Sequence, residues 1–177
     1  MCFSIDRIFS YGGLGPASFA LLPINSSKYP EEKGAQVVSI EGHGPNKDRQ
    51  DRSHCHEVQF HNDYLYGVDL GTDTINVYRY DQTTGELQLN GDRIKTEAGA
   101  GPRHLLFRPD KPLAFVCNEL NSTTNVYRID AAKGKFEHLQ VIATRRSEDQ
   151  NSSLTTSPFV FTHPSFSNRF HQRKQAR

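Results

Sequence analysis

Three short stretches of the chain carry side chains that could together hydrolyse an ester. His54-Cys55-His56 offers two imidazoles, and an imidazole titrates near neutral pH, as a general base must. Arg103-His104 follows the turn at residues 99–102, where glycines let the backbone approach a ligand and a guanidinium can clamp its carboxylate or phosphate. Asn118-Glu119 ends an apolar segment and supplies a carboxylate that can face the same space. Each stretch alone is also explained by an ordinary structural role, so its chemistry depends on whether the fold brings the three together.

The two histidines of the first stretch also have the spacing of metal ligands. Side chains at i and i+2 of a strand point to the same face, and His104, 48 residues after His56, is the nearest candidate for a third ligand. Polar residues at the beginning of a strand, or one histidine acting as a base, explain the pattern without a metal. We therefore predict no metal site.

The three stretches belong to two tandem copies of one pattern, about 50 residues apart. In each copy, short β-branched or apolar segments alternate with turns, which predicts four strands. The predicted strands are 56–60, 64–69, 75–80 and 87–94 in the first copy, and 104–107, 113–118, 124–129 and 136–142 in the second. A repeat of about 40 to 50 residues built from short strands is typical of one blade of a β-propeller. A propeller places equivalent positions of its blades around one central channel, where we expect the site.

The rest of the chain does not complete a propeller. Residues 19–24 and 36–40 are short enough to be strands, residues 1–18 are expected to be an incomplete edge, and residues 42–53 form a charged loop. We predict an all-β chain, a partial β-propeller of two complete four-stranded blades plus fragments over residues 1–143. Residues 144–177 are expected to form an irregular, disordered basic tail. A closed propeller needs about four to eight blades, so the chain is either a fragment or a truncated product.

Composition excludes several classes of function. A net charge of +1 provides no field that would attract nucleic acid, and no segment has the roughly 20 apolar residues of a membrane span. The three cysteines are odd in number and widely spaced, which favours reduced thiols in a cytoplasmic protein. Open blades expose strand edges, so self-association is the expected kind of protein contact.

Five motifs in one order give the chain a specific resemblance. They are Gly-His-Gly-Pro-Asn at 42–46, His-Cys-His at 54–56, Asp-Leu-Gly-Thr-Asp at 69–73, Gly-Pro-Arg-His at 101–104 and Asn-Glu-Leu at 118–120. This set resembles the seven-bladed propeller 6-phosphogluconolactonases over about residues 14–142, and the related carboxy-cis,cis-muconate cyclases are similar. The resemblance implies a cytosolic hydrolase of the pentose phosphate route, acting on a lactone and needing no organic cofactor.

The resemblance also implies roles for particular residues. His56, Arg103 and Glu119 correspond to the catalytic set, and His54, His104 and Asn118 are the neighbouring candidates for binding substrate. His56 would activate water, Arg103 would stabilise the oxyanion or hold the anionic end, and Glu119 would orient one of them. The family has a second arginine in a Ser-Asn-Arg-Gly-His motif, whereas residues 167–171 here lack the glycine.

Two alternatives to hydrolysis remain open at this stage. A cycloisomerase that forms or opens a muconolactone would use acid–base groups without an attack by water. A truncated, inactive propeller fragment, or a chain whose exposed edges pair with another protein, would use none of these residues catalytically.

Overall fold

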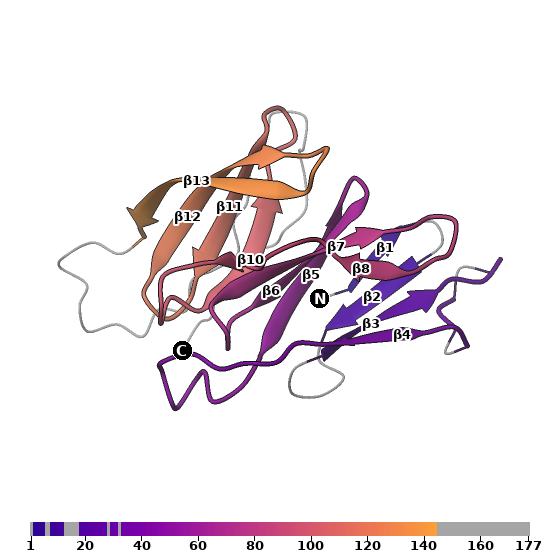
Figure 1. Ribbon diagram of the computed structural model, residues 1–177, viewed down its shortest axis with the longest axis horizontal. Coiled ribbons are helices and arrows are strands. Elements are labelled where there is room, and N and C mark those ends of the chain that lie inside the picture. Colours follow the sequence, from indigo (N-terminus) through magenta and orange to yellow (C-terminus); the bar gives the residue numbers. More distant parts are fainter. Residues whose placement is uncertain (1, 6–7, 13–17, 28, 32, 145–177) are drawn as a thin grey trace, which may run out of the picture.

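The computed structural model describes residues 2–5, 8–12, 18–27, 29–31 and 33–144. The described residues form strands and no helix, and the strands make three antiparallel sheets arranged side by side (Figure 1). Within each four-stranded sheet, strands that follow one another in the chain are neighbours, as in the blades of a propeller. The predicted all-β partial propeller is confirmed.

The first sheet completes a blade where the sequence predicted only fragments. Its strands are β1 (Cys2–Ile5), β2 (Ile8–Gly12), β3 (Ser18–Pro23) and β4 (Gln36–Ser39), in that order across the sheet. The prediction of two complete blades is therefore corrected to three blades, whose sheets have four, five and four strands. The missed strands β1 and β2 have four and five residues, which is too short for periodicity alone to distinguish a strand from a loop.

The second sheet contains the first predicted repeat. Its strands are β5 (Cys55–His61), β6 (Tyr64–Asp69), β7 (Thr74–Tyr80) and β8 (Leu87–Leu89), with β9 (Ile94–Lys95) pairing separately with β7. A single strand was predicted over residues 87–94, but the chain leaves the ladder between β8 and β9. Gly91 lies in this interval with a φ of 73°, a left-handed conformation that interrupts a strand and suits glycine.

The third sheet contains the second repeat. Its strands are β10 (Pro102–Phe107), β11 (Leu113–Asn118), β12 (Thr123–Asp130) and β13 (Lys135–Ala143), in that order. Most of the predicted bounds agree with these within about two residues. The predicted tail begins at residue 144, and residues 145–177 lie outside the described part of the chain.

Two apolar cores hold the sheets together as neighbouring wedges. Between the second and third sheets, the buried ring of Tyr66 lies 4.9 Å from that of Phe107 and 5.2 Å from that of Phe136. Between the first and second sheets, Phe19 meets Tyr78 edge to face at 5.5 Å. Buried aromatic side chains of this kind contribute a large apolar area and specific ring contacts. Strand β5 contacts both β10 and the β1–β2 hairpin, so the first strands of the three sheets lie together.

Candidate active site

An extra residue interrupts the first strand of both the second and the third sheet. The pairing of β5 with β6 skips His56, and the pairing of β10 with β11 skips Arg103. A β-bulge of this kind turns a side chain away from the regular alternation of a strand. His56 and Arg103 therefore occupy the same position in neighbouring blades. They belong to β5 and β10, the first strands of their sheets, which contact each other.

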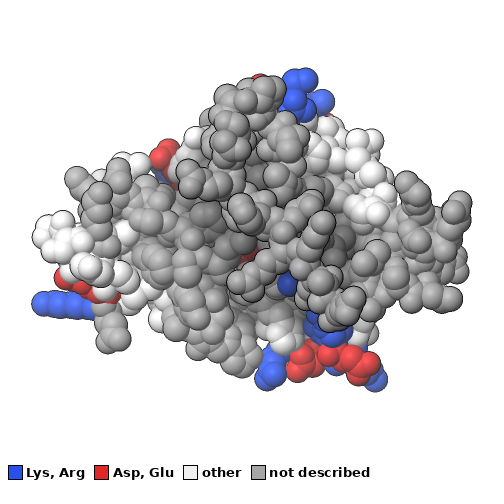
Figure 2. All heavy atoms as spheres, turned by 180° about the vertical axis from the view of Figure 1, so that it is seen from behind, with Lys and Arg blue, Asp and Glu red and all other residues white. Residues whose placement is uncertain are grey.

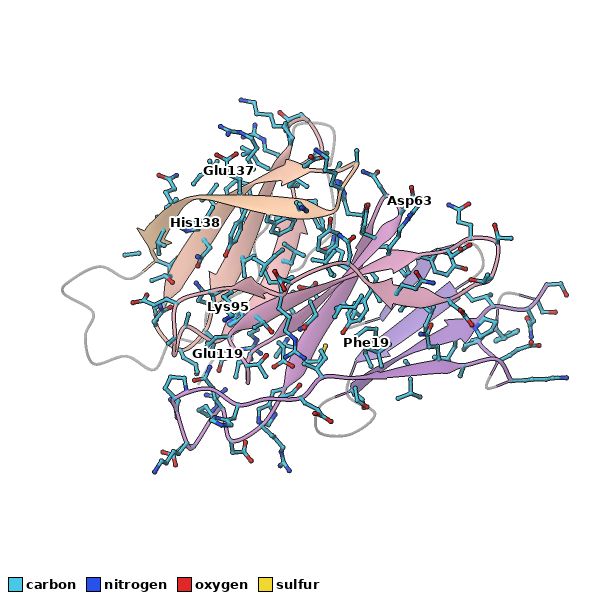
Figure 3. All side chains as sticks on the ribbon, viewed as in Figure 1. Phe19, Asp63, Lys95, Glu119, Glu137 and His138 are labelled. Atoms are coloured by element: carbon cyan, nitrogen blue, oxygen red, sulfur yellow. The ribbon has the colours of Figure 1, made fainter. Side chains whose placement is uncertain are left out.

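Glu119 binds two arginines, one on each carboxylate oxygen. Arg103 donates from Nη1 to Oε2 at 2.6 Å, and Arg49 donates from Nη2 to Oε1 at 2.5 Å. The Glu119 side chain is only 7% exposed, compared with 26% for Arg103 and 51% for Arg49. In Figure 3, Glu119 lies where the end of β11 meets the loop that joins β4 to β5. Burial acts to raise the pKa of Glu119, but the hydrogen bond from Arg49 and the two positive charges outweigh it and hold this pKa below its usual value.

His56 and His104 pack against each other beside this ion pair. Their rings meet edge to face, with centroids 5.0 Å apart. Burial, followed by the positive charge of Arg103, lowers the pKa of His56 to about 4. The same two causes lower the pKa of His104. Both imidazoles are therefore neutral at pH 7, so each has one ring nitrogen able to accept a proton.

The other two predicted binding residues have different surroundings. His54 lies just before β5, where its Nε2 is 2.9 Å from Oδ1 of Asp51 and its amide donates to Asp69 at 2.9 Å. Asn118 is 1% exposed and donates to the hydroxyl of Thr123 at 2.8 Å, within the third sheet. The structure thus brings His56, His104, Arg103 and Glu119 together, places His54 at the rim and encloses the Asn118 amide in a sheet.

A surface cleft of about 500 Å³ opens beside His56. It is lined by Lys47, Asp48, Arg49, Asp51, Arg52, His54, His56 and Leu70. Most of these residues come from the loop between β4 and β5, and basic and acidic side chains gather together at the lower edge of the molecule in Figure 2. The volume suits a small ligand, since typical ligand sites enclose a few hundred cubic ångströms. Among the residues that the structure describes, no three His, Cys, Asp or Glu side chains are grouped as a metal site would require.

A buried polar network links the segments that carry the site, and its hydrogen bonds were not predicted from the sequence. The Asp73 carboxylate accepts hydrogen bonds from the amides of Gly99 at 2.7 Å and Gly101 at 2.8 Å. Gln50, which is fully buried, donates to the same carboxylate at 2.7 Å and to the Leu70 carbonyl at 2.9 Å. The amides of the glycine turn, expected to approach a ligand, are therefore used inside the protein. Asp73 ties the turn before Arg103 to the loop that carries Arg49.

Arg49 is the further site residue that sequence reasoning missed. It lies in the charged loop at residues 42–53, whose length was noted, but its partner Glu119 is 70 residues away in the chain. The one available signal was the position of this loop immediately before the His-Cys-His motif. No pattern within the loop distinguishes Arg49 from Lys47 or Arg52, because only the fold decides which cation reaches Glu119.

Comparison with known proteins identifies the family. The sequence model described as "Lactonase, 7-bladed beta-propeller" matches residues 10–162. The chain belongs to this lactonase family. The match extends past residue 143, where the propeller was predicted to end, into residues that the structure does not describe. The altered arginine motif at residues 167–171 lies beyond the match and also outside the described residues.

Relatives and solved structures agree with the lactonase assignment. The 6-phosphogluconolactonase of Pectobacterium carotovorum subsp. carotovorum is 33% identical over 136 residues, which are 75% of this chain and 36% of that protein. A Bacteroides fragilis protein superposes with a TM-score of 0.73 at 28% identity over 82% of this chain and 43% of its own. The periplasmic gluconolactonase of Pseudomonas aeruginosa superposes with a TM-score of 0.68 at 28% identity, over 81% of this chain and 41% of its own.

The chain thus spans less than half the length of these proteins. Three sheets in the described residues, of four, five and four strands, agree with this share of a seven-bladed propeller. In the described part of the chain, no helix is long and apolar enough to cross a membrane.

Proposed function

We propose that this lactonase-family chain carries a hydrolytic site for a sugar lactone, 6-phosphogluconolactone. One observation supports the proposal most directly: the bulges of two neighbouring blades bring His56, Arg103 and Glu119 to the same place. A water nucleophile needs a base, the lactone carbonyl needs a positive partner, and that partner needs a fixed orientation. The name of the Pectobacterium relative supplies the substrate that we assign to the site.

His56 is the proposed base. Because its pKa is about 4, the imidazole is unprotonated at neutral pH and can take a proton from water. A base with so low a pKa is weak, however, and part of the lowering comes from the charge of Arg103. Negative charge that develops on the lactone carbonyl oxygen at Arg103 would offset that charge and raise the basicity of His56. Stabilisation of the oxyanion and activation of the base are therefore coupled in this proposal.

Arg103 is the proposed electrophilic partner, and Glu119 positions it. The 2.6 Å bond from Nη1 to Oε2 fixes one side of the guanidinium, which leaves its other N–H groups to stabilise a developing oxyanion. His104 supports the ring of His56 through their edge-to-face contact, and His54 at the rim is available to a substrate hydroxyl. That Asn118 binds substrate directly stays a prediction, because its amide contacts Thr123.

Acid release from 6-phosphogluconolactone by the purified chain, corrected for spontaneous hydrolysis, tests the proposal. Replacing Arg103 by Ala is expected to lower the rate roughly a hundredfold, as loss of an oxyanion donor does. Arg128→Ala is the matched control, because Arg128 forms an exposed pair with Glu137 away from the site. An unchanged rate in the Arg103 variant would remove this residue from the mechanism. Turnover of a carboxymuconate instead of the lactone would indicate a cycloisomerase.

The short length of the chain favours a second candidate, an inactive fragment that associates through its exposed strands. The outer strand β13 exposes Val141 at 48% and Ile142 at 44%, and β4 exposes Val37 at 61%. Apolar side chains on an outer strand favour pairing with another chain. Light scattering alongside the lactone assay separates the two: an inactive oligomer supports this candidate, and an active species supports the lactonase.

The remaining elements of the proposal concern cofactor, partners and compartment. The chemistry assigned to His56 and Arg103 needs no organic cofactor, and a lactone is the proposed ligand rather than nucleic acid or a membrane. The free thiols of Cys55 and Cys117 support a reducing compartment, and we assign the chain to the cytoplasm. Fractionation of cells that express the chain would test this assignment.

A further inference from the structure

Two arginines hold Glu119, although one would neutralise it. Arg103 occupies Oε2 and Arg49 occupies Oε1, while His56 beside them is neutral at pH 7. Two guanidinium cations against one carboxylate leave one positive charge without a partner in this group. A surplus charge beside a cleft attracts an anionic ligand, and the field is stronger where protein walls exclude water.

The two arginines that bind Glu119 differ in exposure and in the element that carries them. The Arg103 side chain is 26% exposed and comes from a strand, whereas the Arg49 side chain is 51% exposed and comes from a loop. Water therefore reaches the Arg49 guanidinium more readily and screens its charge more than that of Arg103. Arg49 can therefore exchange Glu119 for another anion at small cost, while Arg103 stays on the carboxylate.

The backbone that carries Arg49 is fixed even though its side chain is half-exposed. The next residue, Gln50, is fully buried, and its amide donates to the Asn46 carbonyl at 2.7 Å. The Gln50 side chain is bonded to Leu70 and Asp73, as described above. The guanidinium of Arg49 can thus turn towards the cleft by side-chain rotation alone, without a movement of the loop.

The lining of the cleft favours a phosphate over a neutral group. Lys47, Arg49 and Arg52 supply three cations, and the acidic residues of the lining are Asp48 and Asp51. Asp51 already accepts from His54 at 2.9 Å and lies 3.5 Å from Arg52, so Asp51 and Arg52 match each other in charge. Of the remaining charges in the lining, Lys47 and Arg49 exceed Asp48 by one positive charge. A guanidinium binds phosphate through two parallel hydrogen bonds, which favours this anion in geometry as well as in charge.

We propose that Arg49 selects phosphorylated substrates by leaving Oε1 of Glu119 and binding the phosphate, while Arg103 remains on Oε2 beside His56. The inference rests on the proposed lactonase function and adds the residue that recognises the phosphate. The lactone ring then lies between the phosphate on Arg49 and the catalytic pair.

Calorimetric titration of the full chain with 6-phosphogluconate and with gluconate tests this role. The two ligands differ only in the phosphate, so the ratio of their dissociation constants isolates its recognition. The unsubstituted chain is expected to bind 6-phosphogluconate at least tenfold more tightly. Arg49→Gln should weaken binding of 6-phosphogluconate roughly 10- to 100-fold, as loss of a charge-assisted hydrogen bond does, and leave gluconate within about twofold.

Arg128→Gln is the matched control for this titration. Its side chain is 57% exposed and donates to Glu137 at 2.7 Å, so it resembles Arg49 in exposure and pairing but lies on another part of the surface. Circular dichroism confirms that each variant is folded. If Arg49→Gln keeps the preference for the phosphorylated ligand, the inference is wrong and the lactonase proposal stands. If the unsubstituted chain binds neither ligand, both are wrong.

Glu119→Gln gives a test of opposite sign. An uncharged amide no longer competes for Arg49, so affinity for inorganic phosphate should rise severalfold in this variant. The gain should disappear in the double variant Glu119→Gln, Arg49→Gln. A gain that persists in the double variant would assign the phosphate to Arg103 and overturn the inference.

Discussion

The second and third sheets have the same backbone arrangement at the start of their first strand, but the side chains there differ in charge. In each sheet, the residue after the second strand donates its amide to the carbonyl just before the first strand: Leu70 to His54 at 3.0 Å, and Glu119 to Gly101 at 2.8 Å. The bulged residue that follows is a neutral imidazole in one sheet and a guanidinium in the other. A repeated backbone thus provides two equivalent positions, which a base and a cation occupy side by side.

The two sheets also differ in where they place a glycine at this junction. Gly71 follows β6, and a Cβ there would lie 1.8 Å from the carbonyl oxygen of Arg52. Its counterpart after β11 is Leu120, which instead presses on Gly101, where a Cβ would lie 2.5 Å from the leucine Cγ. Both sheets thus have a close contact between the segment after the second strand and the segment before the first strand. The glycine that makes room for it lies after the second strand in one sheet and before the first strand in the other, so the contact recurs although the glycine changes position.

The largest expected effect comes from breaking this contact in the second sheet. Gly71→Ala places a methyl group against a backbone oxygen, which cannot rotate away as a side chain would. We expect the free energy of unfolding to fall by at least about 3 kcal/mol, at the upper end of overpacking costs, because the loop must move. Urea denaturation followed by circular dichroism measures the change.

Gly91→Ala is the control for this substitution. Gly91 has a positive φ of 73° but no atom within 4 Å of a built Cβ, so only the backbone conformation is penalised. The cost of a left-handed conformation is about 1–2 kcal/mol. Equal losses in the two variants would show that the approach of the Arg52 carbonyl does not constrain Gly71.

The sequence predicted the two repeats well because each has strands long enough to show their pattern. It failed for β1 and β2, whose short segments become strands because β1 pairs with β2 and β2 pairs with β3. It also merged β8 and β9, since nothing local indicates that β9 turns back to pair with the beginning of β7. In both cases the deciding interactions are backbone hydrogen bonds to another strand, which residue types do not encode.

The residues of the candidate site likewise include some that the sequence predicts and one that it does not. His56, Arg103 and Glu119 could be selected in advance because each lies in a short motif that carries the resemblance to the lactonases. Arg49 could not, because the loop that carries it has no counterpart in the repeat and offers three similar cations. Its selection depends on the buried bonds of Gln50, a polar residue in a charged loop whose burial no local pattern indicates.

The second prediction concerns the residue that follows the bulge in the first strand of each sheet. Glu57 is buried and accepts a hydrogen bond from the Leu105 amide at 2.7 Å, joining two blades, whereas its counterpart is His104. Burial raises the pKa of Glu57 to about 7, against the smaller opposing effect of that hydrogen bond. Glu57→Gln keeps an oxygen for the amide and removes the charge. We expect this variant to be more stable than the unsubstituted chain at pH 8, by about 1–3 kcal/mol.

The direction in which stability changes with pH depends on whether the folded or the unfolded chain holds the Glu57 proton. Between the unfolded value of 4.5 and a folded pKa of about 7, the folded chain keeps the Glu57 proton and the unfolded chain releases it. Stability from this residue is therefore full below pH 4.5 and lost as the pH rises through 7. Urea unfolding of both proteins from pH 5 to pH 8 should show a difference that grows with pH. A difference independent of pH would mean that Glu57 is charged throughout.

The smallest effect tests whether the two bulged residues act on each other. Arg103→Gln removes the second-largest cause of the low pKa of His56, so NMR titration of the imidazole should show that pKa rising from about 4. It should stay below 6.5, because burial, the largest cause, is unchanged. Glu119→Gln should shift it the other way, since the Glu119 charge acts to raise it. Shifts of the same sign in both variants would show a change in burial instead of a coupling of charges between the two blades.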